Sequence, residues 1–262
     1  MSEHVIQKVL ITGANGFIGG ALMRFYNNQG QDVAGVDLVG NGADIVEGDI
    51  SQPNSITQLL DECDVIIHTA ALVSNAMQDS DMWRVNVLAT RNLIQAAKEH
   101  KVKRFVQISS VVAYGNKAEG ELNENHPVHA DGGSYVLTKL ASEHVVLSEQ
   151  ANDDIEVVII RPGDAYGPGS RPWIIEPLEA IAKNQFMLPA KGEGFFRPIY
   201  IDDLVRGIAL ATSHPDAAGE IFNLSCENYM LTKEYFASHY KWLEKKGPML
   251  VYTKLDLRIS AN

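Results

Sequence analysis

A tyrosine and a lysine, Tyr135 and Lys139, lie four residues apart in a stretch with helical spacing. Residues four apart share one face of a helix, so the phenol and the ammonium would lie close together. A tyrosine hydroxyl has a pKa of about 10, and it exchanges protons at neutral pH only where a cation stabilises the phenolate. Lys139 would supply that cation. Ser110, which closes an apolar run upstream, could hydrogen-bond a substrate oxygen and orient it.

Each of these features has a plainer interpretation when it is taken alone. A Tyr and a Lys four apart are usually a surface pair on a helix, and the serine pair Ser109 and Ser110 could simply cap the end of a strand. Their order along the chain, after a glycine-rich turn, favours a proton-transfer site. We therefore take Ser110, Tyr135 and Lys139 as the candidate catalytic residues.

The glycine-rich turn lies between a β-branched apolar run at 8–12 and a helical pattern from Phe17 to Tyr26. Gly13 permits a tight turn, Gly16 lets a pyrophosphate approach the backbone, and Gly19 allows the helix and strand to pack closely. A glycine triplet alone is also compatible with an incidental turn. In this context it predicts a dinucleotide site, to which we also assign Asn15, Phe17 and Ile18.

Asp37 ends the second apolar run, 18 residues after the last glycine of the turn. A carboxylate there can accept hydrogen bonds from adenosine ribose hydroxyls, although it could also be an ordinary acid at the end of a strand. No Lys or Arg occurs from Phe25 to Trp83, so a ribose phosphate would meet acids and no cation. The sequence therefore predicts NAD rather than NADP. Asp49, followed by Ile50, either closes the adenine pocket or belongs to a plain turn.

Apolar runs and helical patterns alternate along the first two thirds of the chain, which predicts a doubly wound parallel sheet of the Rossmann type. The expected strands are 8–12, 32–37, 43–47, 64–68, 104–109 and 155–161, and the expected helices are 17–26, 54–60, 84–101 and 135–151. A helix at 174–183, a strand at 196–201, a helix at 202–211, a strand at 220–224 and a helix at 232–245 follow, the last opened by a threonine cap.

These elements suggest one large unit and a smaller C-terminal lobe. We expect residues 1–165 to form the dinucleotide-binding domain, with 196–215 returning to it. Residues 166–195 and 216–262 would then form a small substrate-binding lobe. Turn-rich segments at 115–133 and 163–172 would lie at the carboxyl edge of the sheet, where open α/β folds bind ligands.

Composition limits the possible partners and compartments. The 262-residue chain has a formal net charge of -11 and no basic run, which argues against nucleic acid as a partner. Its two cysteines have neither metal-ligand nor redox-motif spacing, so they indicate reduced thiols and a cytoplasmic protein. The first residues do not resemble a signal peptide, and no apolar stretch approaches the ~20 residues that span a bilayer. We expect no membrane association.

A series of motifs resembles the extended short-chain dehydrogenase/reductases, which include epimerases, dehydratases and 3β-hydroxysteroid dehydrogenases. The resemblance covers roughly residues 8 to 225. The motifs are TGANGFIG at 12–19, HTAA at 68–71, Asn86-Val87 with Thr90, ISSVVAYG at 108–115, Tyr135-x-x-x-Lys139, RPGDAYGP at 161–168 and YIDDL at 200–204.

The resemblance implies roles for particular residues. The family's catalytic serine stands four residues before the tyrosine of a Tyr-Gly pair, here Tyr114, which selects Ser110 over Ser109. Lys139 would also hold the nicotinamide ribose, and Asn86 would fix the central helix. The resemblance also implies a homodimer built from the helices at 84–101 and 135–151. The remaining cofactor residues that it implies are Ala70, Ala71, Pro162 and Gly163.

The family acts on several substrate classes, and two positions favour a less charged one. Sugar-nucleotide enzymes commonly carry Asn where this chain has Asp164, and a carboxylate would repel a diphosphate. Their phosphate-binding arginine stands four residues before the position of Tyr200, whereas Arg197 stands three before it, and one residue turns a strand side chain to the opposite face. We therefore expect a dehydrogenase or reductase of a carbonyl or alcohol. An epimerase or dehydratase of nucleotide sugars is the second hypothesis, and a non-catalytic dinucleotide sensor is the third.

Other candidate sites have stronger structural explanations. His126 and His129 flank Pro127 in a polar loop, so we expect no metal there. Asp202 and Asp203 open a helix, where acids favour the dipole. Several aromatic residues could line a substrate pocket or pack a core, namely Trp173, Phe186, Phe195 and Phe196.

Overall fold

The computed structural model describes residues 6, 8–73, 78–115, 120–151, 154–245 and 250–252. Backbone contacts divide the chain into two compact units. Unit 1 comprises Met1–Pro162 and Asp202–Leu224, and unit 2 comprises Gly163–Ile201 and Ser225–Asn262. The division expected from the sequence, with 1–165 and 196–215 in one domain and 166–195 and 216–262 in the other, stays a prediction.

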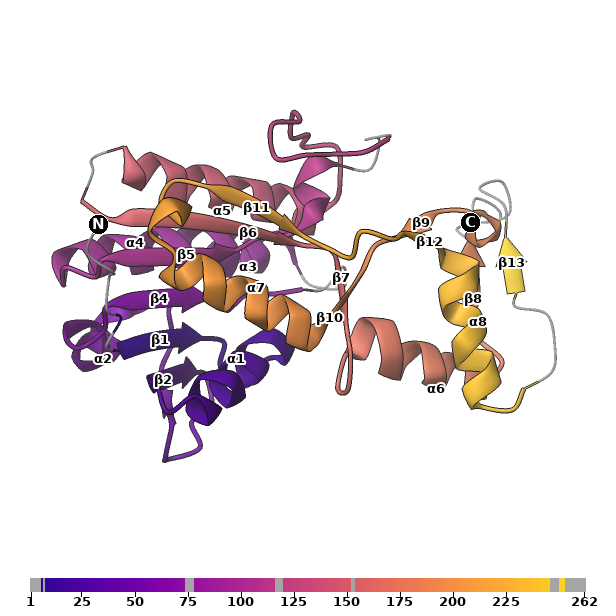
Figure 1. Ribbon diagram of the computed structural model, residues 1–262, viewed down its shortest axis with the longest axis horizontal. Helices are drawn as coiled ribbons and strands as arrows, with labels where there is room; N and C mark the ends of the chain where they lie inside the picture. Colours follow the sequence, from indigo (N-terminus) through magenta and orange to yellow (C-terminus); the bar gives the residue numbers. More distant parts are fainter. Residues whose placement is uncertain are drawn as a thin grey trace. The chain divides into compact units, whose positions relative to one another are not determined.

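Unit 1 is built on a parallel sheet that contains seven strands among the described residues, in the order β11-β6-β5-β4-β1-β2-β3 (Figure 1). Because β2 and β4 flank β1, the strand order reverses there, and ligands of open α/β sheets bind at such switch points. The predicted doubly wound Rossmann fold is therefore confirmed. The strands are β1 (Lys8–Thr12), β2 (Asp32–Asp37), β3 (Ile45–Glu47), β4 (Val65–His68), β5 (Arg104–Ile108), β6 (Glu156–Pro162) and β11 (Ile221–Leu224).

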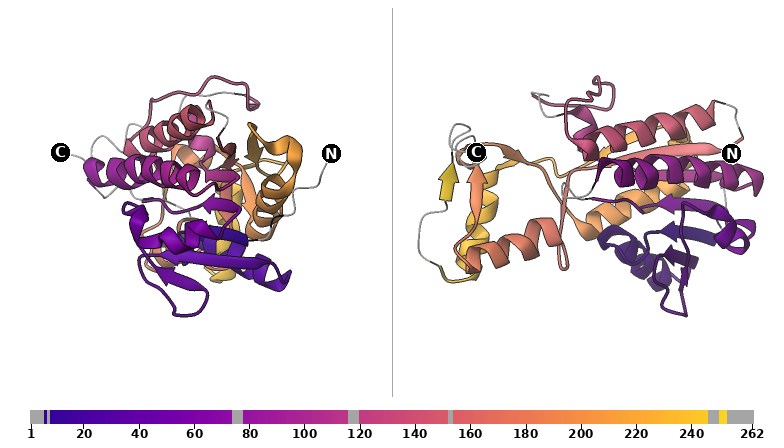
Figure 2. Two further views of the ribbon diagram at one scale, coloured as in Figure 1. Left: turned by 90° about the vertical axis from the view of Figure 1, so that its left-hand side faces the viewer. Right: turned by 180° about the vertical axis from the view of Figure 1, so that it is seen from behind.

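Helices cover both faces of this sheet. Helices α1 and α7 lie on one face, and α4 and α5 lie side by side on the other (Figure 2, left). Strands β4 and β5 are buried along their whole length, which explains why Val, Ile and Phe predominate in them. The helices are α1 (Phe17–Asn28), α2 (Thr57–Asp61), α3 (Asp79–Trp83), α4 (Thr90–Glu99), α5 (Ser134–Gln150) and α7 (Ile201–Ser213), with 3-10 turns η1 (Pro53–Ile56), η3 (Val111–Tyr114) and η6 (Pro215–Ala217).

The helix expected over 84–101 is wrong as a single regular element. The structure has α3, then a π-helical segment η2 (Arg84–Ala89), and then α4. A π turn widens the helix locally, and such turns are frequent at functional sites. Here the widened turn includes Asn86, whose side chain bonds to the backbone of Leu72 after β4.

Two contacts at the margins of unit 1 come from charged side chains. The guanidinium of Arg104, at the start of β5, donates from Nη1 to the carbonyls of Ala211, Thr212 and His214 at 3.2, 2.8 and 2.8 Å. These carbonyls lie at the end of α7, where helix carbonyls lack intrahelical partners. On the edge strand β11, the backbone N–H of Asn223 donates to the carboxylate of Glu124 at 2.7 Å.

Unit 2 has an aromatic core of its own. Phe186, Phe196, Tyr235 and Phe236 are buried together, and Trp173 packs on Phe196 with ring centroids 4.8 Å apart. Three of the four aromatic residues considered as possible pocket residues thus belong to a core, whereas Phe195 is exposed. The elements are β7 (Asp164–Tyr166), π-helical η4 (Arg171–Ile175), α6 (Glu176–Ala182), β8 (Met187–Pro189), η5 (Ala190–Gly192), β9 (Phe195–Phe196), β10 (Pro198–Tyr200), β12 (Met230–Leu231), α8 (Thr232–Trp242) and β13 (Leu250–Tyr252).

Two expectations for unit 2 are corrected. The strand predicted over 196–201 is broken at Arg197, because β9 pairs antiparallel with β12 whereas β10 pairs parallel with β7, and between them the N–H of Arg197 donates to the side chain of Asp164. The predicted threonine cap of the last helix is also wrong. Leu231 holds the cap position, and the Thr232 hydroxyl donates to the carbonyl of Gly194. In the described part of the chain, no helix combines the length and the apolarity needed to cross a bilayer.

Candidate cofactor and active site

The glycine turn between β1 and α1 brings backbone very close to backbone. Gly13 has a φ of +69°, a conformation that favours glycine. A Cβ on Gly19 would lie 2.1 Å from the carbonyl oxygen of Gly13, so no larger residue fits there. Gly16 is the N-cap of α1 and makes no side-chain cap bond, which leaves N–H groups of the first turn for an anionic ligand. Phe17 and Ile18 lie half-buried in that first turn.

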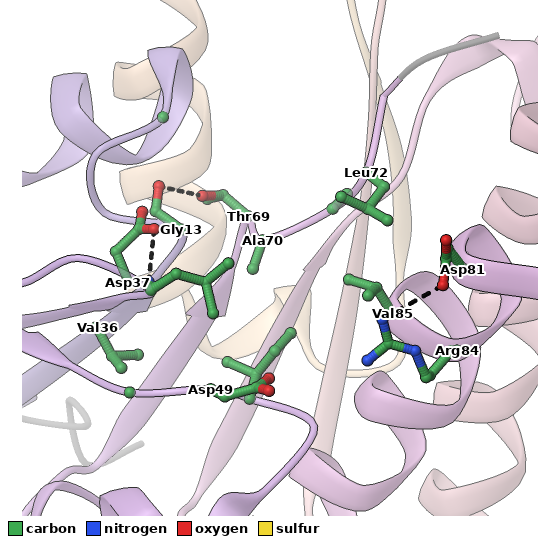
Figure 3. A pocket seen from close by; sticks show the side chains of 15 residues that line it. Gly13, Val36, Asp37, Asp49, Thr69, Ala70, Leu72, Asp81, Arg84 and Val85 are labelled. Carbon is green, nitrogen blue, oxygen red and sulfur yellow. Dashed lines mark hydrogen bonds and ion pairs between the residues drawn. The ribbon is translucent and has the colours of Figure 1, made fainter. Parts of the chain in front are cut away.

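A pocket of about 450 Å³ opens beside this turn at the carboxyl edge of the sheet (Figure 3). It brings together seven of the residues predicted to bind the cofactor. They come from the ends of four different strands or the loops that follow them, as expected at a switch point. These residues are Gly13, Gly16, Asp37, Asp49, Ile50, Ala70 and Ala71.

Asp37 is held at the wall of this pocket by backbone amides. Its Oδ2 accepts from the N–H of Asn15 at 2.9 Å, and its Oδ1 accepts from the N–H of Leu38 at 2.7 Å. The side chain of Asn15 in turn donates to the carbonyl of Val39 at 2.6 Å. Asn15 therefore links the glycine turn to the end of β2 and fixes the orientation of the carboxylate.

Several pocket residues were not found from the sequence. Arg84 lies in the wall with Asp81, to which it is ion-paired at 3.4 Å (Figure 3). It follows directly after the interval without Lys or Arg, so only its position on a helix next to the predicted Asn86 could have indicated it. The others are Val36, Leu38, Gly48, Thr69, Leu72 and Val85.

Asn86 does not line this pocket but connects two of its supports. Its Oδ1 accepts from the N–H of Leu72 at 2.7 Å, and its Nδ2 donates to the carbonyl of Leu72 at 3.0 Å. Nδ2 also donates to the hydroxyl of Thr138 on α5 at 3.1 Å. The side chain thus ties the loop after β4 to the residue that precedes Lys139.

A buried polar chain continues from Asn86 to β1. The Thr90 hydroxyl donates to the carbonyl of Asn86 at 2.9 Å, so it accepts from Nε2 of His68, also at 2.9 Å. Nδ1 of His68 then accepts from the Thr12 hydroxyl at 2.7 Å. Burial, assisted by the charge of Lys139, lowers the pKa of His68 to about 3. His68 is therefore neutral at physiological pH and serves as a bridge between β4 and its neighbours.

Ser110, Tyr135 and Lys139 lie together in unit 1. Ser110 precedes η3, just beyond the end of β5, and its hydroxyl lies close enough to Tyr135, in the first turn of α5, to influence the pKa of the phenol. The ammonium of Lys139 lies 5.9 Å from the centroid of the Tyr135 ring. It donates to the carbonyl of Ile108 at 2.9 Å, and its side chain is buried.

Burial acts on both ionisable groups of this cluster. It raises the pKa of Tyr135, and the hydrogen bond from Ser110 opposes that rise. It lowers the pKa of Lys139 to about 8, against the attraction of Glu143. In each case burial favours the uncharged form, because the charged form loses its hydration. A proton-transfer role for Tyr135 therefore depends on groups that keep Lys139 charged.

Other predicted site residues lie elsewhere. Pro162 ends β6, and Gly163 opens unit 2, where a Cβ would lie 2.6 Å from the carbonyl oxygen of Arg197. Nδ1 of His126 accepts from the N–H of Asn123 at 3.0 Å within a loop. Among the residues that the structure describes, no group of three His, Cys, Asp or Glu side chains has an arrangement suited to a metal ion.

Comparisons with known proteins match this geometry. A family model described as the NAD dependent epimerase/dehydratase family matches residues 9–225. The dTDP-glucose 4,6-dehydratase of Streptomyces niveus is 28% identical over 243 residues, which cover 83% of this chain and 72% of that protein. Sterol demethylase protein B of Methylococcus capsulatus is 34% identical over 183 residues, which cover 64% of this chain and 53% of that protein. A solved structure of MoeE5 in complex with UDP-glucose and NAD superposes with a TM-score of 0.83 at 27% identity, over 94% of this chain and 84% of that one.

Proposed function

Because the chain belongs to the NAD-dependent epimerase/dehydratase family, we propose that it transfers hydride between NAD and a carbonyl or secondary alcohol through Ser110, Tyr135 and Lys139. One observation carries this proposal. The Tyr135 phenol lies beside Ser110, and its ring centroid lies 5.9 Å from the buried ammonium of Lys139. A phenol, a hydroxyl and a cation in this arrangement suit reversible proton transfer to a substrate oxygen.

The pocket beside the glycine turn suits a dinucleotide. The turn has no Cβ at its close approach, and the free N–H groups of α1 would bind the pyrophosphate. Asp37 would accept hydrogen bonds from the adenosine ribose, and Asp49 with Ile50 would border the adenine. When bound, NAD would supply the hydride acceptor or donor.

The protein's own residues would handle the proton. Ser110 would orient the substrate oxygen by a hydrogen bond, which keeps the reacting atoms aligned. Tyr135 would take the proton of an alcohol, or give one to a carbonyl, at its phenolic oxygen. Lys139 would stabilise the phenolate, and the closely packed end of β5 would keep water away from its ammonium.

The substrate assignment rests on Asp164 in unit 2. Its Oδ2 accepts from the backbone N–H of Arg197 at 3.0 Å, and burial raises its pKa to about 6. The guanidinium of Arg197 is directed to Tyr229, 5.3 Å from the ring centroid, rather than to Asp164. No ion pair of Asp164 occurs among the residues that the structure describes, and a carboxylate without one suits a substrate that carries no diphosphate. A nucleotide-sugar epimerase or dehydratase is the second candidate, favoured by the likeness to MoeE5 with UDP-glucose.

The proposal extends to assembly and compartment. A homodimer through α4 and α5 is supported by apolar side chains on the outer surface of these helices and of η2. Leu88 is 53% exposed, and Leu137, Ala141 and Val145 are half-buried in the isolated chain. A cytoplasmic location is supported by Cys63 and Cys226, neither of which is in a disulfide.

The test combines cofactor binding with turnover. We expect the purified protein to bind NAD by calorimetry and to form NADH with a member of a panel of secondary alcohols and sterols. The Tyr135→Phe variant should lose about 10³-fold in kcat and retain its affinity for NAD, because the phenol provides acid–base chemistry. The matched control is Tyr240→Phe, which removes a phenol from unit 2.

Product analysis separates the two candidates. An epimerase or dehydratase would convert a nucleotide sugar without net NADH, so products must be separated as well as absorbance followed. Full activity in Tyr135→Phe would show that the catalytic assignment is wrong.

A further inference from the structure

A buried ion pair, Glu143 with Arg161, lies in the interior next to the candidate catalytic lysine. Glu143 follows Lys139 by one turn of α5 and is only 1% exposed. Its carboxylate faces Arg161 on β6, with Nε to Oε1 at 3.0 Å and Nη2 to Oε2 at 2.7 Å. The Ser109 hydroxyl also donates to Oε1. Two N–H groups of one guanidinium and a hydroxyl thus converge on this carboxylate, the arrangement in which charge-assisted hydrogen bonds are strongest.

Arg161 is itself fixed from a second direction. Its Nη1 donates to the Tyr114 hydroxyl at 2.9 Å, and its guanidinium lies 4.9 Å from the Tyr114 ring centroid. The Tyr114 hydroxyl lies 2.9 Å from Oδ1 of Asn223 on β11. Glu143 therefore cannot turn away from its place beside Lys139 without breaking a connected set of buried hydrogen bonds.

Stability alone does not account for this pair. Two buried charges lose their hydration, and well-packed apolar residues in their place are often as stable or more so. The position of the pair also matters. Glu143 stands four residues after Lys139 on α5, and residues four apart on a helix have neighbouring side chains. That position puts a fixed negative charge next to the only cation of the Ser110, Tyr135 and Lys139 cluster.

We propose that Glu143 is a positioning residue that acts through Lys139, holding its ammonium charged in an interior that would otherwise favour the neutral amine. This inference rests on the proposed function for the role of Lys139, and it deepens that function by naming the group that maintains it. Arg161 and Ser109 would keep the Glu143 carboxylate in place.

The groups that face Lys139 support this role. Tyr135 and Glu143 lie one turn before and after it on α5, the carbonyl of Ile108 accepts its hydrogen bond from β5, and His68 faces it from β4. His68 is neutral, and Arg161 on β6 is bound to Glu143, so Glu143 supplies the attraction that opposes burial. Without it, the pKa of Lys139 should fall below its value of about 8.

The experiment measures the ionisation of Lys139 directly, by NMR titration of the protein with ¹³C-labelled lysine and without substrate or cofactor. The Lys139 signal is assigned by its loss in Lys139→Met. We expect Glu143→Gln to lower the pH midpoint of this signal by about one pH unit. The matched control is Glu149→Gln, which removes a carboxylate from the same helix, where it is paired with Lys98. It should leave the midpoint unchanged.

A second variant covers the case in which Glu143→Gln does not fold, since it leaves Arg161 charged and unpaired. Replacing both partners, as Glu143→Gln with Arg161→Met, removes the unpaired charge and should lower the midpoint in the same direction. The pH midpoint of the Lys139 signal in Glu143→Asp should lie closer to the wild-type value than the midpoint in Glu143→Gln, because Asp retains the carboxylate. A folded Glu143→Gln or double variant with the wild-type midpoint would overturn the proposal. Failure to bind NAD or turn over substrate would instead count against the proposed function, which this titration does not involve.

Discussion

At the scale of single residues, the proposed preference for NAD rests on Asp37, whose carboxylate already accepts backbone hydrogen bonds. Asp37 accepts hydrogen bonds from the amides of Asn15 and Leu38, one to each oxygen. Each oxygen keeps a further lone pair for a ribose hydroxyl. The carboxylate is thus oriented before ligand arrives, which reduces the ordering cost of binding.

Removing this carboxylate should weaken NAD binding. We expect Asp37→Ala to raise the Kd for NAD about 10- to 100-fold, since hydrogen bonds to a charged group contribute ~1.5–3 kcal/mol. It should also reduce the ratio of NAD affinity to NADP affinity, because the Asp37 carboxylate no longer repels the ribose phosphate of NADP. Calorimetry with both cofactors measures this. Asp44→Ala, an exposed acid nearby, is the control, and equal NAD affinity in both variants would contradict the prediction.

The residues that sequence could identify are those whose type is dictated locally. Gly13 and Gly19 are required by a positive φ and by a close backbone approach, and Asp37 by its place at a strand end. Arg84 was missed because its position in the wall depends on the π-helical turn. That turn accompanies the contact between Asn86 and Leu72, which lies 14 residues away along the chain. No local pattern indicates such a contact.

At the scale of elements, the sequence predicted the buried strands more accurately than the elements whose limits depend on tertiary contacts. Strands β1 and β2 match their predicted limits, because apolar runs bounded by turns identify central strands. The region 84–101 failed because helical periodicity does not distinguish a π turn from an α turn. The strand at 196–201 failed because Arg197 pairs with Asp164, a tertiary contact.

Helix α7 depends on one such tertiary contact at its C-terminal end. We expect Arg104→Met to lower the free energy of unfolding by about 3 kcal/mol, because it leaves the carbonyls of Ala211, Thr212 and His214 without this donor and removes the ion pair between Arg104 and Glu156. Urea unfolding followed by circular dichroism measures this. Lys103→Met, which removes an exposed cation from the preceding position, should change stability by less than about 0.5 kcal/mol. Similar losses in both variants would argue against the role of Arg104.

At the scale of the whole molecule, the sequence predicted two units with a distal segment returning to the first. Backbone contacts join Asp202–Leu224 to unit 1, whereas the sequence-based division has 196–215 returning to it. The precise limits could not be derived, because they depend on which side chains of 163–224 meet each core. The aromatic composition of unit 2 did indicate a second core, but not which aromatic residues remain exposed.

The proposed homodimer can be tested on the outer surface of α4 and α5. We expect Val145→Arg combined with Leu88→Arg to raise the dimer dissociation constant about 100-fold or more, because it buries unpaired charge in the interface. Light scattering after size-exclusion chromatography measures the mass. Leu210→Arg, an exposed leucine on α7 at the opposite face of the sheet, should leave the dimer intact. A wild-type chain that is monomeric at all accessible concentrations would rule the dimer out.

The bond from Asn223 to Glu124 has a consequence for self-association. A terminal strand with free amides is a template on which a foreign strand can grow the sheet. In β11 the amide of Asn223 is already occupied by a carboxylate from a loop 99 residues earlier in the chain. A foreign strand would have to displace that carboxylate before it could pair with β11 at Asn223, so this contact opposes extension of the sheet at that position.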